Sequence, residues 1–418
     1  MTCRIGNVSR GAVVAAGLFL LTASSARADI VLDWNATMRA VINQPPFPGA
    51  RSAAITQLAV FEAVNAIVGD YESYLGQSIP APAGASAEAA VAAAAHKALI
   101  TLFPAQSSTL NAALAASLAT IEDGPAESDG VAVGVAAAVA VLALRTNDGA
   151  AVPESYLPPA SAGPGDWLLT GNCPASGGSF AHWARVTPFV LDSADRFRPG
   201  PPPHLNGGKY RKDFNEVKAV GEINSVLRTQ DRTDVAHFYA RYSPVTWANV
   251  AAAQVATIEG DSLSENARAF ALLNMALSDA AVATFEAKYY YKTWRPETAI
   301  HLADTDGNAK TEPDPAYKPL VNAPCFPGYP SNHATLSYAA REVLERLYGP
   351  QGHDITLATA LLPGVVLNYT AFKQITEDVD DARVYGGIHF RFDQDAGAKL
   401  GTKIGAYVVK NSLRVVHP

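Results

Sequence analysis

Residues 84–146 constrain the fold of this chain most strongly, because they consist largely of alanine and valine. Alanine has the highest intrinsic helix propensity of all residues. Pro104 and the turn Asp123-Gly124-Pro125 interrupt the segment, so the sequence predicts two or three packed helices there. We interpret these helices as scaffold.

Apolar residues recur at helical spacing through most of the remaining chain, and no segment shows a convincing alternation typical of β-strands. We expect further helices at 30–44, 51–68, 207–227, 231–241, 244–259, 263–294, 332–348, 356–385 and 390–413. The sequence therefore predicts an all-α fold.

Proline and glycine clusters set residues 147–206 apart as a long ordered loop. We therefore expect residues 29–418 to form one large domain, with N-terminal helices in 29–146, this loop, and a helical bundle in 207–418. Apolar residues make up 49% of the chain and charged residues 17%, which excludes a disordered protein.

The formal net charge of −7 argues against nucleic-acid binding, which normally needs a basic surface. Any anion site must therefore be a local cluster of positive charge. The sequence does not reveal the oligomeric state, and a homo-oligomer is compatible with it.

The first 28 residues resemble a secretory signal. Arg4 and Arg10 are followed by the short apolar run 11–22 and by an A-x-A cleavage site at Ala26-Arg27-Ala28. We expect cleavage before Asp29 and a periplasmic or secreted protein. In the mature chain no uninterrupted apolar run approaches about 18 residues, so we expect no membrane span there.

Two cysteines remain after cleavage, Cys173 and Cys325. An even number in an oxidising compartment is typical of a disulfide, but two unrelated thiols are an equal alternative at this point.

Three segments in the C-terminal third carry the chemistry. The first contains Lys288 and Arg295, seven residues apart and followed by Pro296. We expect both cations on one face at the end of a helix, where they can grip one anion. Taken alone, a pair of this kind is more often two solvated surface cations.

The second segment is Pro330-Ser331-Asn332-His333. Ser331 precedes an apolar periodic run, which predicts a helix N-cap. The first turn of a helix offers unpaired amides to an anion, and His333 lies where its imidazole could exchange a proton with that anion.

The third segment contains Arg383, His389 and Asp393. Gly386-Gly387 separates two expected helices, and His389 and Asp393 are four residues apart. The carboxylate can therefore hold one ring nitrogen while the other faces an anion, as for nucleophilic and metal-ligating histidines. Each segment has a structural explanation alone, but together they predict an enclosed site for a tetrahedral oxyanion.

These segments resemble the motifs of the superfamily that contains type 2 phosphatidic acid phosphatases, bacterial acid phosphatases and vanadium-dependent haloperoxidases. In the family these motifs are K-x6-R-P, P-S-G-H and S-R-x5-H-x3-D. They correspond to residues 288–296, 330–333 and 382–393 of this chain, which differs from them at positions 332 and 382. Trp294, the run Cys325-Phe326-Pro327-Gly328-Tyr329 and the surroundings of Trp183 resemble the soluble, exported haloperoxidase branch.

The resemblance implies paired four-helix bundles with the site at one end of the C-terminal bundle. It implies that vanadate is the cofactor, with phosphate as a competing occupant. The side chains implied to bind the vanadate oxygens, joined by the Asn332 amide, are Lys288, Arg295, Ser331 and Arg383. By the same resemblance His389, backed by Asp393, bonds vanadium, and His333 takes a proton as hydrogen peroxide binds.

Two positions depart from the family pattern: Asn332 replaces glycine and Ala382 replaces serine. We hypothesise that Asn332 either weakens vanadate affinity or adds a side-chain hydrogen bond to the peroxide oxygens. Phe326 stands where the family lines its halide pocket, and Trp294 could line the same pocket. A core position is the equal alternative for Trp294.

The leading expectation is an exported, vanadate-dependent haloperoxidase that oxidises halide with hydrogen peroxide to hypohalous acid. The alternative is a periplasmic acid phosphatase that cleaves a phosphate ester with His389 as nucleophile. A third interpretation is a phosphate- or vanadate-binding protein without catalysis. A membrane lipid phosphatase is disfavoured, because that branch places these motifs among transmembrane helices.

Overall fold

The computed structural model describes residues 29–77 and 79–416, so the expected secretory signal lies outside the described residues. The helices are α1 (Ile30–Val41), α2 (Pro46–Val68), α3 (Ala87–Leu102), α4 (Ser107–Leu118), α5 (Pro125–Leu144), α6 (Gly208–Gly221), α7 (Gln230–Arg241), α8 (Pro244–Glu259), α9 (Leu263–Tyr291), α10 (Pro296–His301), α11 (Asn332–Tyr348), α12 (Phe372–Tyr385) and α13 (Arg391–Asn411). Strands β1 (Ile355–Ala358) and β2 (Val366–Tyr369) form an antiparallel hairpin. The predicted all-α class is confirmed, since this hairpin is the whole of the sheet structure in the described part of the chain.

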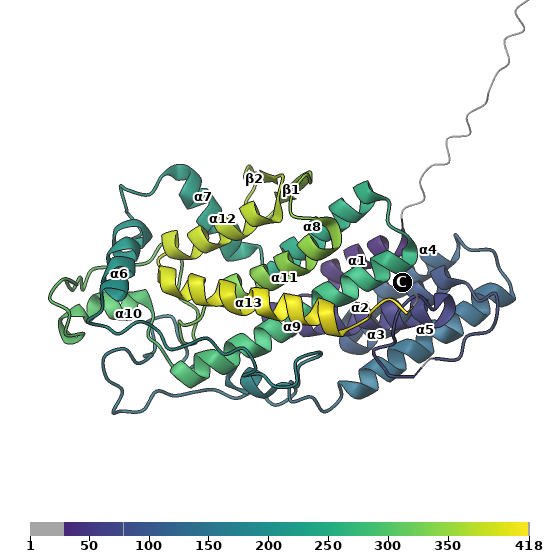
Figure 1. Cartoon of the computed structure of the whole chain (residues 1–418), viewed down its shortest axis with the longest axis horizontal. Coiled ribbons are helices and arrows are strands. Elements are labelled where there is room, and N and C mark those ends of the chain that lie inside the picture. Colours follow the sequence, from purple (N-terminus) through teal and green to yellow (C-terminus); the bar gives the residue numbers. More distant parts are fainter. Residues whose placement is uncertain (1–28, 78, 417–418) are drawn as a thin grey trace, which may run out of the picture.

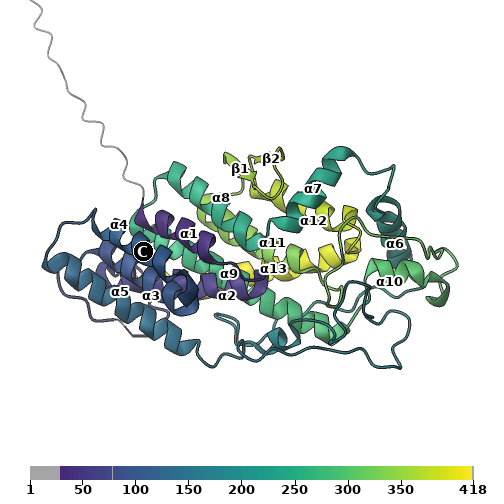
Figure 2. The ribbon, with the colours of Figure 1, turned by 180° about the vertical axis from the view of Figure 1, so that it is seen from behind.

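The molecule is elongated, with α1 to α5 at one end and α6 and α10 at the other (Figure 1). The central helix is α9, which packs against α2 of the N-terminal group and against α11 and α13 of the C-terminal group. Within the N-terminal group α3 packs on α2 and α5, and within the C-terminal group α11 packs on α12 and α13. The view from behind shows the same order of helices along the long axis (Figure 2).

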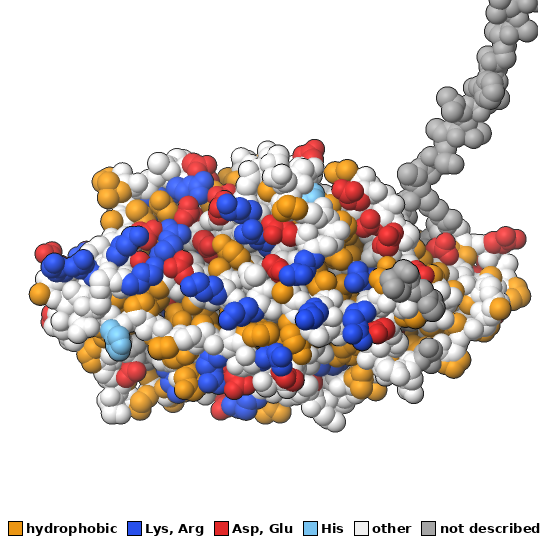
Figure 3. Space-filling view, in the orientation of Figure 1, with side chains coloured by type: hydrophobic (Ala, Val, Ile, Leu, Met, Phe, Trp, Pro, Cys, Tyr) orange, Lys and Arg blue, Asp and Glu red, His pale blue; other side chains and the backbone are white. Residues whose placement is uncertain are grey.

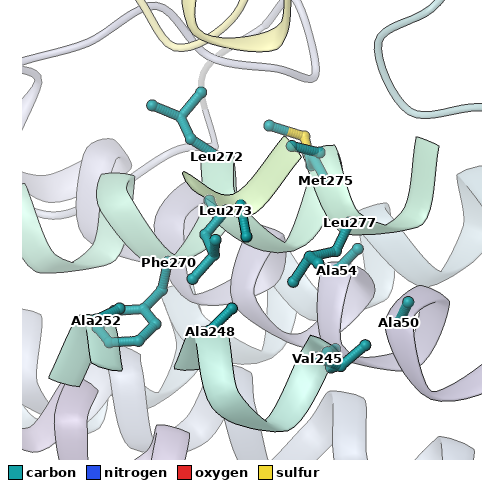
Figure 4. Packing of buried hydrophobic residues seen from close by; sticks show 14 of the residues in the cluster. Ala50, Ala54, Val245, Ala248, Ala252, Phe270, Leu272, Leu273, Met275 and Leu277 are labelled. Carbon is teal, nitrogen blue, oxygen red and sulfur yellow. The ribbon is translucent and has the colours of Figure 1, made fainter. Parts of the chain in front are cut away.

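Small side chains allow the central helices to approach closely. Figure 4 shows Ala248 and Ala252 of α8 and Ala54 of α2 beside the larger side chains of α9, among them Phe270 and Leu273. All five residues are at most 1% exposed. The alanine-rich composition therefore determines how near α2 and α8 come to α9, as expected for close-packed interiors.

The expected helix at 356–385 is wrong in its first half. Residues 355–369 form the β-hairpin, and α12 begins only at Phe372. The turn of the hairpin contains Pro363 and Gly364, whose φ is +90°, and either residue would break a helix. The strand residues have apolar side chains at spacings that a short helix shares, which is why the pattern was ambiguous.

Two helices, α5 and α9, are long and apolar enough to cross a membrane by length and composition. In α9 94% of the most apolar window is buried inside the protein, whereas in α5 the share is 33%. The burial of α9 accounts for its composition as a core helix.

The long loop between α5 and α6 is anchored on α9. The buried carboxylate of Asp279 accepts hydrogen bonds from the backbone N–H groups of Phe189, Val190 and Leu191, at 2.6, 2.8 and 2.9 Å. The Arg145 guanidinium lies 4.0 Å from the centre of the Phe189 ring. Cys173 and Cys325 form a disulfide, which joins this loop to the segment just before Phe326.

Candidate oxyanion site

Four helix ends meet at one end of the C-terminal group of helices. The N-termini of α11 and α13 converge there with the C-termini of α9 and α12. Lys288 and Arg383 lie in the last turns of α9 and α12, where the partial negative charge of the helix end favours cations. The N-termini contribute Ser331 and Asp393 to the same region, and the Ser331 N–H donates to the Asp393 carbonyl at 3.0 Å.

Lys288 and Arg295 reach the site by different routes from those expected. The helix α9 ends at Tyr291, Lys292 takes the left-handed conformation with φ +50°, and Arg295 stands before α10. The two cations therefore do not share one helix face. They converge because the chain turns, and each lies about equally far from the Phe326 ring centre, at 5.3 and 5.2 Å.

Backbone carbonyls hold both cations in place. Lys288 Nζ donates to the carbonyls of Pro327 and Gly328 at 2.7 and 2.6 Å. Arg295 donates through Nε to the Phe326 carbonyl at 3.0 Å and through Nη1 to the Ile388 carbonyl, also at 3.0 Å. Its Nη2 has no hydrogen-bond partner among the described residues.

His389 is held by Asp393 and turned toward Arg295. Its Nδ1 lies 2.8 Å from Asp393 Oδ2, and its Nε2 lies 2.9 Å from Arg295 Nη1. Because the guanidinium only donates, Nε2 is the acceptor and carries the lone pair, while Nδ1 carries the hydrogen. Burial and the cations of Arg295, Lys288 and Arg383 lower the pKa of His389 well below its ordinary value. The expected arrangement of His389 and Asp393 is therefore present.

The third cation, Arg383, lies near the second histidine, His333. Arg383 is 3% exposed, and its Nη1 lies 3.5 Å from the Tyr239 carbonyl. His333 stands in the first turn of α11 and is partly exposed. Burial and the nearby Arg383 lower the pKa of His333 well below its ordinary value. His333 is thus the most accessible residue of the site.

Ser331 is the N-cap of α11, as predicted, and its side chain accepts from the Ala334 N–H at 3.4 Å. Asn332 is the first residue of α11 and is 3% exposed. Neither atom of its carboxamide has a hydrogen-bond partner within the described ranges. A buried amide without partners is costly, so Asn332 is poised to receive a polar ligand.

Gly387 shows why a glycine precedes His389. Its φ is +78°, and a Cβ there would lie 2.4 Å from the Gly221 carbonyl oxygen. Both the backbone conformation and the close approach of α6 exclude a side chain. This turn is what separates α12, which carries Arg383, from α13, which carries Asp393.

The two residues expected at a halide pocket lie in different surroundings. Phe326 is 8% exposed, lies beside Lys288 and Arg295, and packs against Phe285 and Phe47 with ring centres 5.3 and 5.9 Å apart. Trp294 packs instead with Tyr210, at 6.5 Å, in a second aromatic core cluster. Phe326 is therefore the one that lies against the cations, and Trp294 has a core position.

The charge of this cluster is its most informative property. Lys288, Arg295 and Arg383 are at most 3% exposed, and Asp393 is the carboxylate that lies with them. Three buried cations against one carboxylate leave an excess of positive charge in a low dielectric, which a bound anion would neutralise. On the surface shown in Figure 3, by contrast, Lys and Arg are interspersed with Asp and Glu.

A vanadate group fits these residues. The Arg295 Nη2 and Arg383 Nε atoms are buried donors without a partner in the described structure. The lone pair of His389 Nε2, which accepts from Arg295 Nη1 in this structure, is the one that a metal centre would take instead. The residues would hold the oxyanion by donors from three cations and by the start of α11, with His389 as the metal ligand.

One residue that contacts the site carried no sequence signal. Tyr239 contributes its backbone carbonyl to Arg383, and a carbonyl contact does not depend on the side-chain type. Only the packing of α7 against α12 brings this carbonyl to the site, and the spacing of sequence motifs does not reveal such packing.

The chain is similar to known vanadium enzymes over most of its length. Residues 268–418 match the family model of the VCPO second helical-bundle domain. The vanadium chloroperoxidase of Curvularia inaequalis is 24% identical in an alignment of 195 positions that covers 35% of this chain and 31% of that protein. The match thus spans about a third of the length of that relative.

Solved structures extend the likeness to the whole fold. A bacterial vanadium-dependent iodoperoxidase is 25% identical, with a TM-score of 0.76 over 93% of this chain and 97% of that one. An apo-type bacterial vanadium-dependent chloroperoxidase shares the fold at 16% identity, with a TM-score of 0.71 over 89% and 95% of the two chains. With the family match over the second bundle, these similarities show that the chain has the fold of the vanadium-dependent haloperoxidases and resembles them in the sequence of its second bundle.

Proposed function

We propose that this protein is an exported, vanadate-dependent haloperoxidase that oxidises halide with hydrogen peroxide to hypohalous acid. The observation that carries the proposal is the buried excess of positive charge beside the His389 Nε2 lone pair. A tetrahedral oxyanion with a metal centre satisfies both features at once, since its oxygens accept from the cations and its metal takes the lone pair.

Vanadate bound in this site would supply a Lewis acid that activates hydrogen peroxide. The protein's residues would orient the oxyanion, with Asp393 fixing the His389 ring so that Nε2 faces Arg295. His333 is partly exposed, and its lowered pKa favours the unprotonated ring, so this imidazole is suited to accept the proton of an incoming peroxide. Phe326 would offer an apolar wall for the halide beside Lys288.

Export is part of the proposal. The signal-like pattern of residues 1–28 supports it, and so does the disulfide between Cys173 and Cys325, since such bonds persist mainly in oxidising compartments. N-terminal sequencing of the protein from the periplasm or medium tests this. We expect a mature chain that begins at Asp29, and recovery of full-length protein in the cytoplasm would contradict export.

The activity is tested with purified protein, orthovanadate, hydrogen peroxide and bromide or iodide, by halogenation of a dye. We expect halogenation that His389→Ala abolishes and phosphate competes away. His96→Ala is the matched control, because this histidine is half-buried on α3 in the N-terminal group of helices and bonds Asn111 there. Its activity should equal that of the wild type.

A phosphate-ester assay without vanadate separates the alternative enzyme. Ester hydrolysis without vanadate-dependent halogenation would overturn the proposal in favour of a phosphatase that uses the same His389 lone pair as nucleophile. Oxyanion binding without either activity would favour a binding protein.

A further inference from the structure

A cavity of about 410 Å³ lies between α2, the end of α5 and the long loop that follows α5. Its wall is partly apolar, with Pro48, Ala150 and Ala151, and the aromatic side chains of Phe180 and Trp183 also line it. Among the described residues, none of those assigned to the oxyanion site lines this cavity. Its volume and its aromatic wall are typical of sites that bind small organic molecules.

The Phe180 ring is fixed at this cavity by its neighbours. Phe180 has the left-handed backbone conformation, with φ +64°, which is uncommon for a residue other than glycine and recurs at ligand sites. Its ring centre lies 5.3 Å from that of Phe47, 5.7 Å from Phe285 and 6.2 Å from Trp183. Phe180 is only partly buried, so it offers an aromatic surface to a ligand.

Arg51 offers a fixed cationic donor at the same cavity. Its Nε donates to Asp148 Oδ2 at 2.6 Å, and its Nη2 donates to the Arg145 carbonyl at 2.7 Å. These two bonds hold the guanidinium in place, while Nη1 has no hydrogen-bond partner in the described part of the chain. A guanidinium held in this way is suited to a carboxylate.

His182 supplies a second donor. It lines the cavity and is 7% exposed. Its Nδ1 accepts from the Glu154 N–H at 3.2 Å, so the hydrogen of the neutral ring is on Nε2. Burial lowers the pKa of His182, which favours this neutral form. The Nε2–H group has no hydrogen-bond partner among the described residues.

The carboxylates at the cavity already have cationic partners. Asp148 pairs with Arg51 and Arg145, and Glu154 pairs with Arg185. The cavity therefore combines an aromatic surface with two fixed donors, of which one is positively charged. A ligand that matches both features has an aromatic ring and an anionic acceptor group.

We propose that this cavity binds a small aromatic carboxylate. The ring of the ligand lies against Phe180 and Trp183, and its carboxylate accepts from Arg51 Nη1 and His182 Nε2. Such a carboxylate with a phenolic ring is also an electron-rich acceptor for halogen. Hypohalous acid would replace a ring C–H bond by a carbon–halogen bond, and the hydrogen would leave with the hydroxide as water.

The aromatic side chains connect the cavity to the oxyanion site. The Phe285 ring contacts Phe180 on one side and Phe326 on the other, at 5.7 and 5.3 Å. The Phe326 ring centre in turn lies 5.3 Å from Lys288 Nζ. One ring thus separates the surface that would bind the ligand from the wall of the oxyanion site. The use of the ligand as a halogen acceptor rests on the function proposed above, whereas its binding does not.

Binding is measured by calorimetric titration with 4-hydroxybenzoate, without vanadate or peroxide and with saturating phosphate to occupy the oxyanion site. We expect one saturable site per chain. The uncharged 4-hydroxybenzyl alcohol should bind about 10-fold or more weakly, the usual value of a hydrogen bond to a charged group. The absence of saturable binding would overturn the proposal. So would binding that phosphate abolishes, because the carboxylate would then have occupied the oxyanion site.

Two variants test the location of the site. Arg51→Gln should weaken 4-hydroxybenzoate binding by about 10-fold or more, whereas Arg196→Gln removes an exposed cation of the same loop region and should leave it unchanged. Ala151→Trp should fill the cavity and abolish binding, and it removes no hydrogen bond of a side chain. Ala160→Trp is its control, since Ala160 is exposed outside the cavity. Wild-type affinity in both Arg51→Gln and Ala151→Trp would contradict this location.

Halogenation separates the binding site from the proposed function. With vanadate, peroxide and bromide, the wild type should halogenate 4-hydroxybenzoate in preference to 4-hydroxybenzyl alcohol, and Ala151→Trp should lose this preference. Binding as described in a protein without haloperoxidase activity would keep the aromatic carboxylate site and reject the proposed function. Halogenation without any binding at the cavity would do the reverse.

Discussion

His389 Nδ1 lies 2.8 Å from Asp393 Oδ2, and this contact decides which nitrogen of His389 faces the cations. Asp393 also accepts from the Phe390 N–H at 3.1 Å, so it orders the start of α13 as well. Burial raises the pKa of Asp393, while Lys288 and Arg295 counteract it. The Asp393 carboxylate thus has two roles: it orders the start of α13, and it directs the lone pair of His389 Nε2 toward the cations.

Asp393→Asn should weaken orthovanadate binding by about 10- to 100-fold, the usual effect of losing the partner of a ligating histidine. The amide oxygen can still accept from Nδ1–H, but without the negative charge that strengthens this hydrogen bond. Calorimetric titration with orthovanadate measures the change. Asp395→Asn is the control, since Asp395 is an exposed residue of the same helix that pairs with Lys209. Equal affinities in the two variants would contradict the orienting role.

Lys288 should make oxyanion binding depend on pH. Burial and the Arg295 guanidinium lower the pKa of Lys288 well below its ordinary value. As the pH rises through this lowered pKa, the ammonium loses its charge and phosphate affinity should fall.

Lys288→Arg separates this effect from the ionisation of phosphate, because a guanidinium stays charged throughout. Phosphate titrations carried from neutral pH up to the ordinary pKa of lysine should show the decline in the wild type and a flatter profile in the variant. Parallel profiles would show that Lys288 does not titrate in this range.

The disulfide between Cys173 and Cys325 should contribute to stability, because it closes a loop with a sequence separation of 152 residues. The double variant Cys173→Ser/Cys325→Ser should lower the free energy of unfolding by about 2–4 kcal/mol. Denaturant unfolding with and without a reductant measures this. The reductant should destabilise the wild type and leave the double variant unchanged.

Asp279→Asn should loosen the long loop from α9. The amide nitrogen cannot accept, so at least one of the N–H groups of 189–191 loses its partner, at a cost of about 1–3 kcal/mol. Hydrogen exchange of these amides should speed up. Asp192→Asn is the control, since that exposed carboxylate pairs with Arg196 and should leave both stability and exchange nearly unchanged.

The types and spacings of the residues predicted which ones form the site. How these residues lie relative to one another depends on the fold. Two contacts span a single helix turn: Ser331 caps the start of α11, and Asp393 holds the His389 ring. The sequence spacing of these residues was therefore enough to predict them. Arg295 lies beyond the end of α9, and its approach to Phe326 follows from a turn at Lys292 that no spacing rule predicts. The Tyr239 carbonyl is invisible in the sequence for the same reason: tertiary contacts place it there.

The hairpin at 355–369 shows a second limit. Short apolar strands and short helices share the same residue types, and the choice between them depends on neighbours. Here Gln254 of α8 bonds the backbone of Thr356 through both its amide nitrogen and its amide oxygen, at 2.8 Å each. That contact supports β1 from a segment about a hundred residues earlier, which local patterns do not include.

Asn332 gives the sharpest test of how far this site departs from its relatives. Its carboxamide is buried at the start of α11 without a hydrogen-bond partner in the described part of the chain. In the free protein such a group is costly, whereas a bound oxyanion would supply a partner. Asn332→Ala should therefore stabilise the free protein while weakening oxyanion binding, two effects of opposite sign.

We expect the vanadate affinity of Asn332→Ala to fall by about 2- to 12-fold, the value of one hydrogen bond of about 0.5–1.5 kcal/mol. Thermal unfolding without ligand and calorimetric titration with orthovanadate measure the two effects separately. Asn332→Gly restores the residue typical of the family and should show the same loss of affinity, with a smaller gain in stability because glycine disfavours the helix. Unchanged affinity and unchanged turnover in Asn332→Gly would show that the amide takes no part in binding, and a gain in affinity would show that it crowds the oxyanion instead.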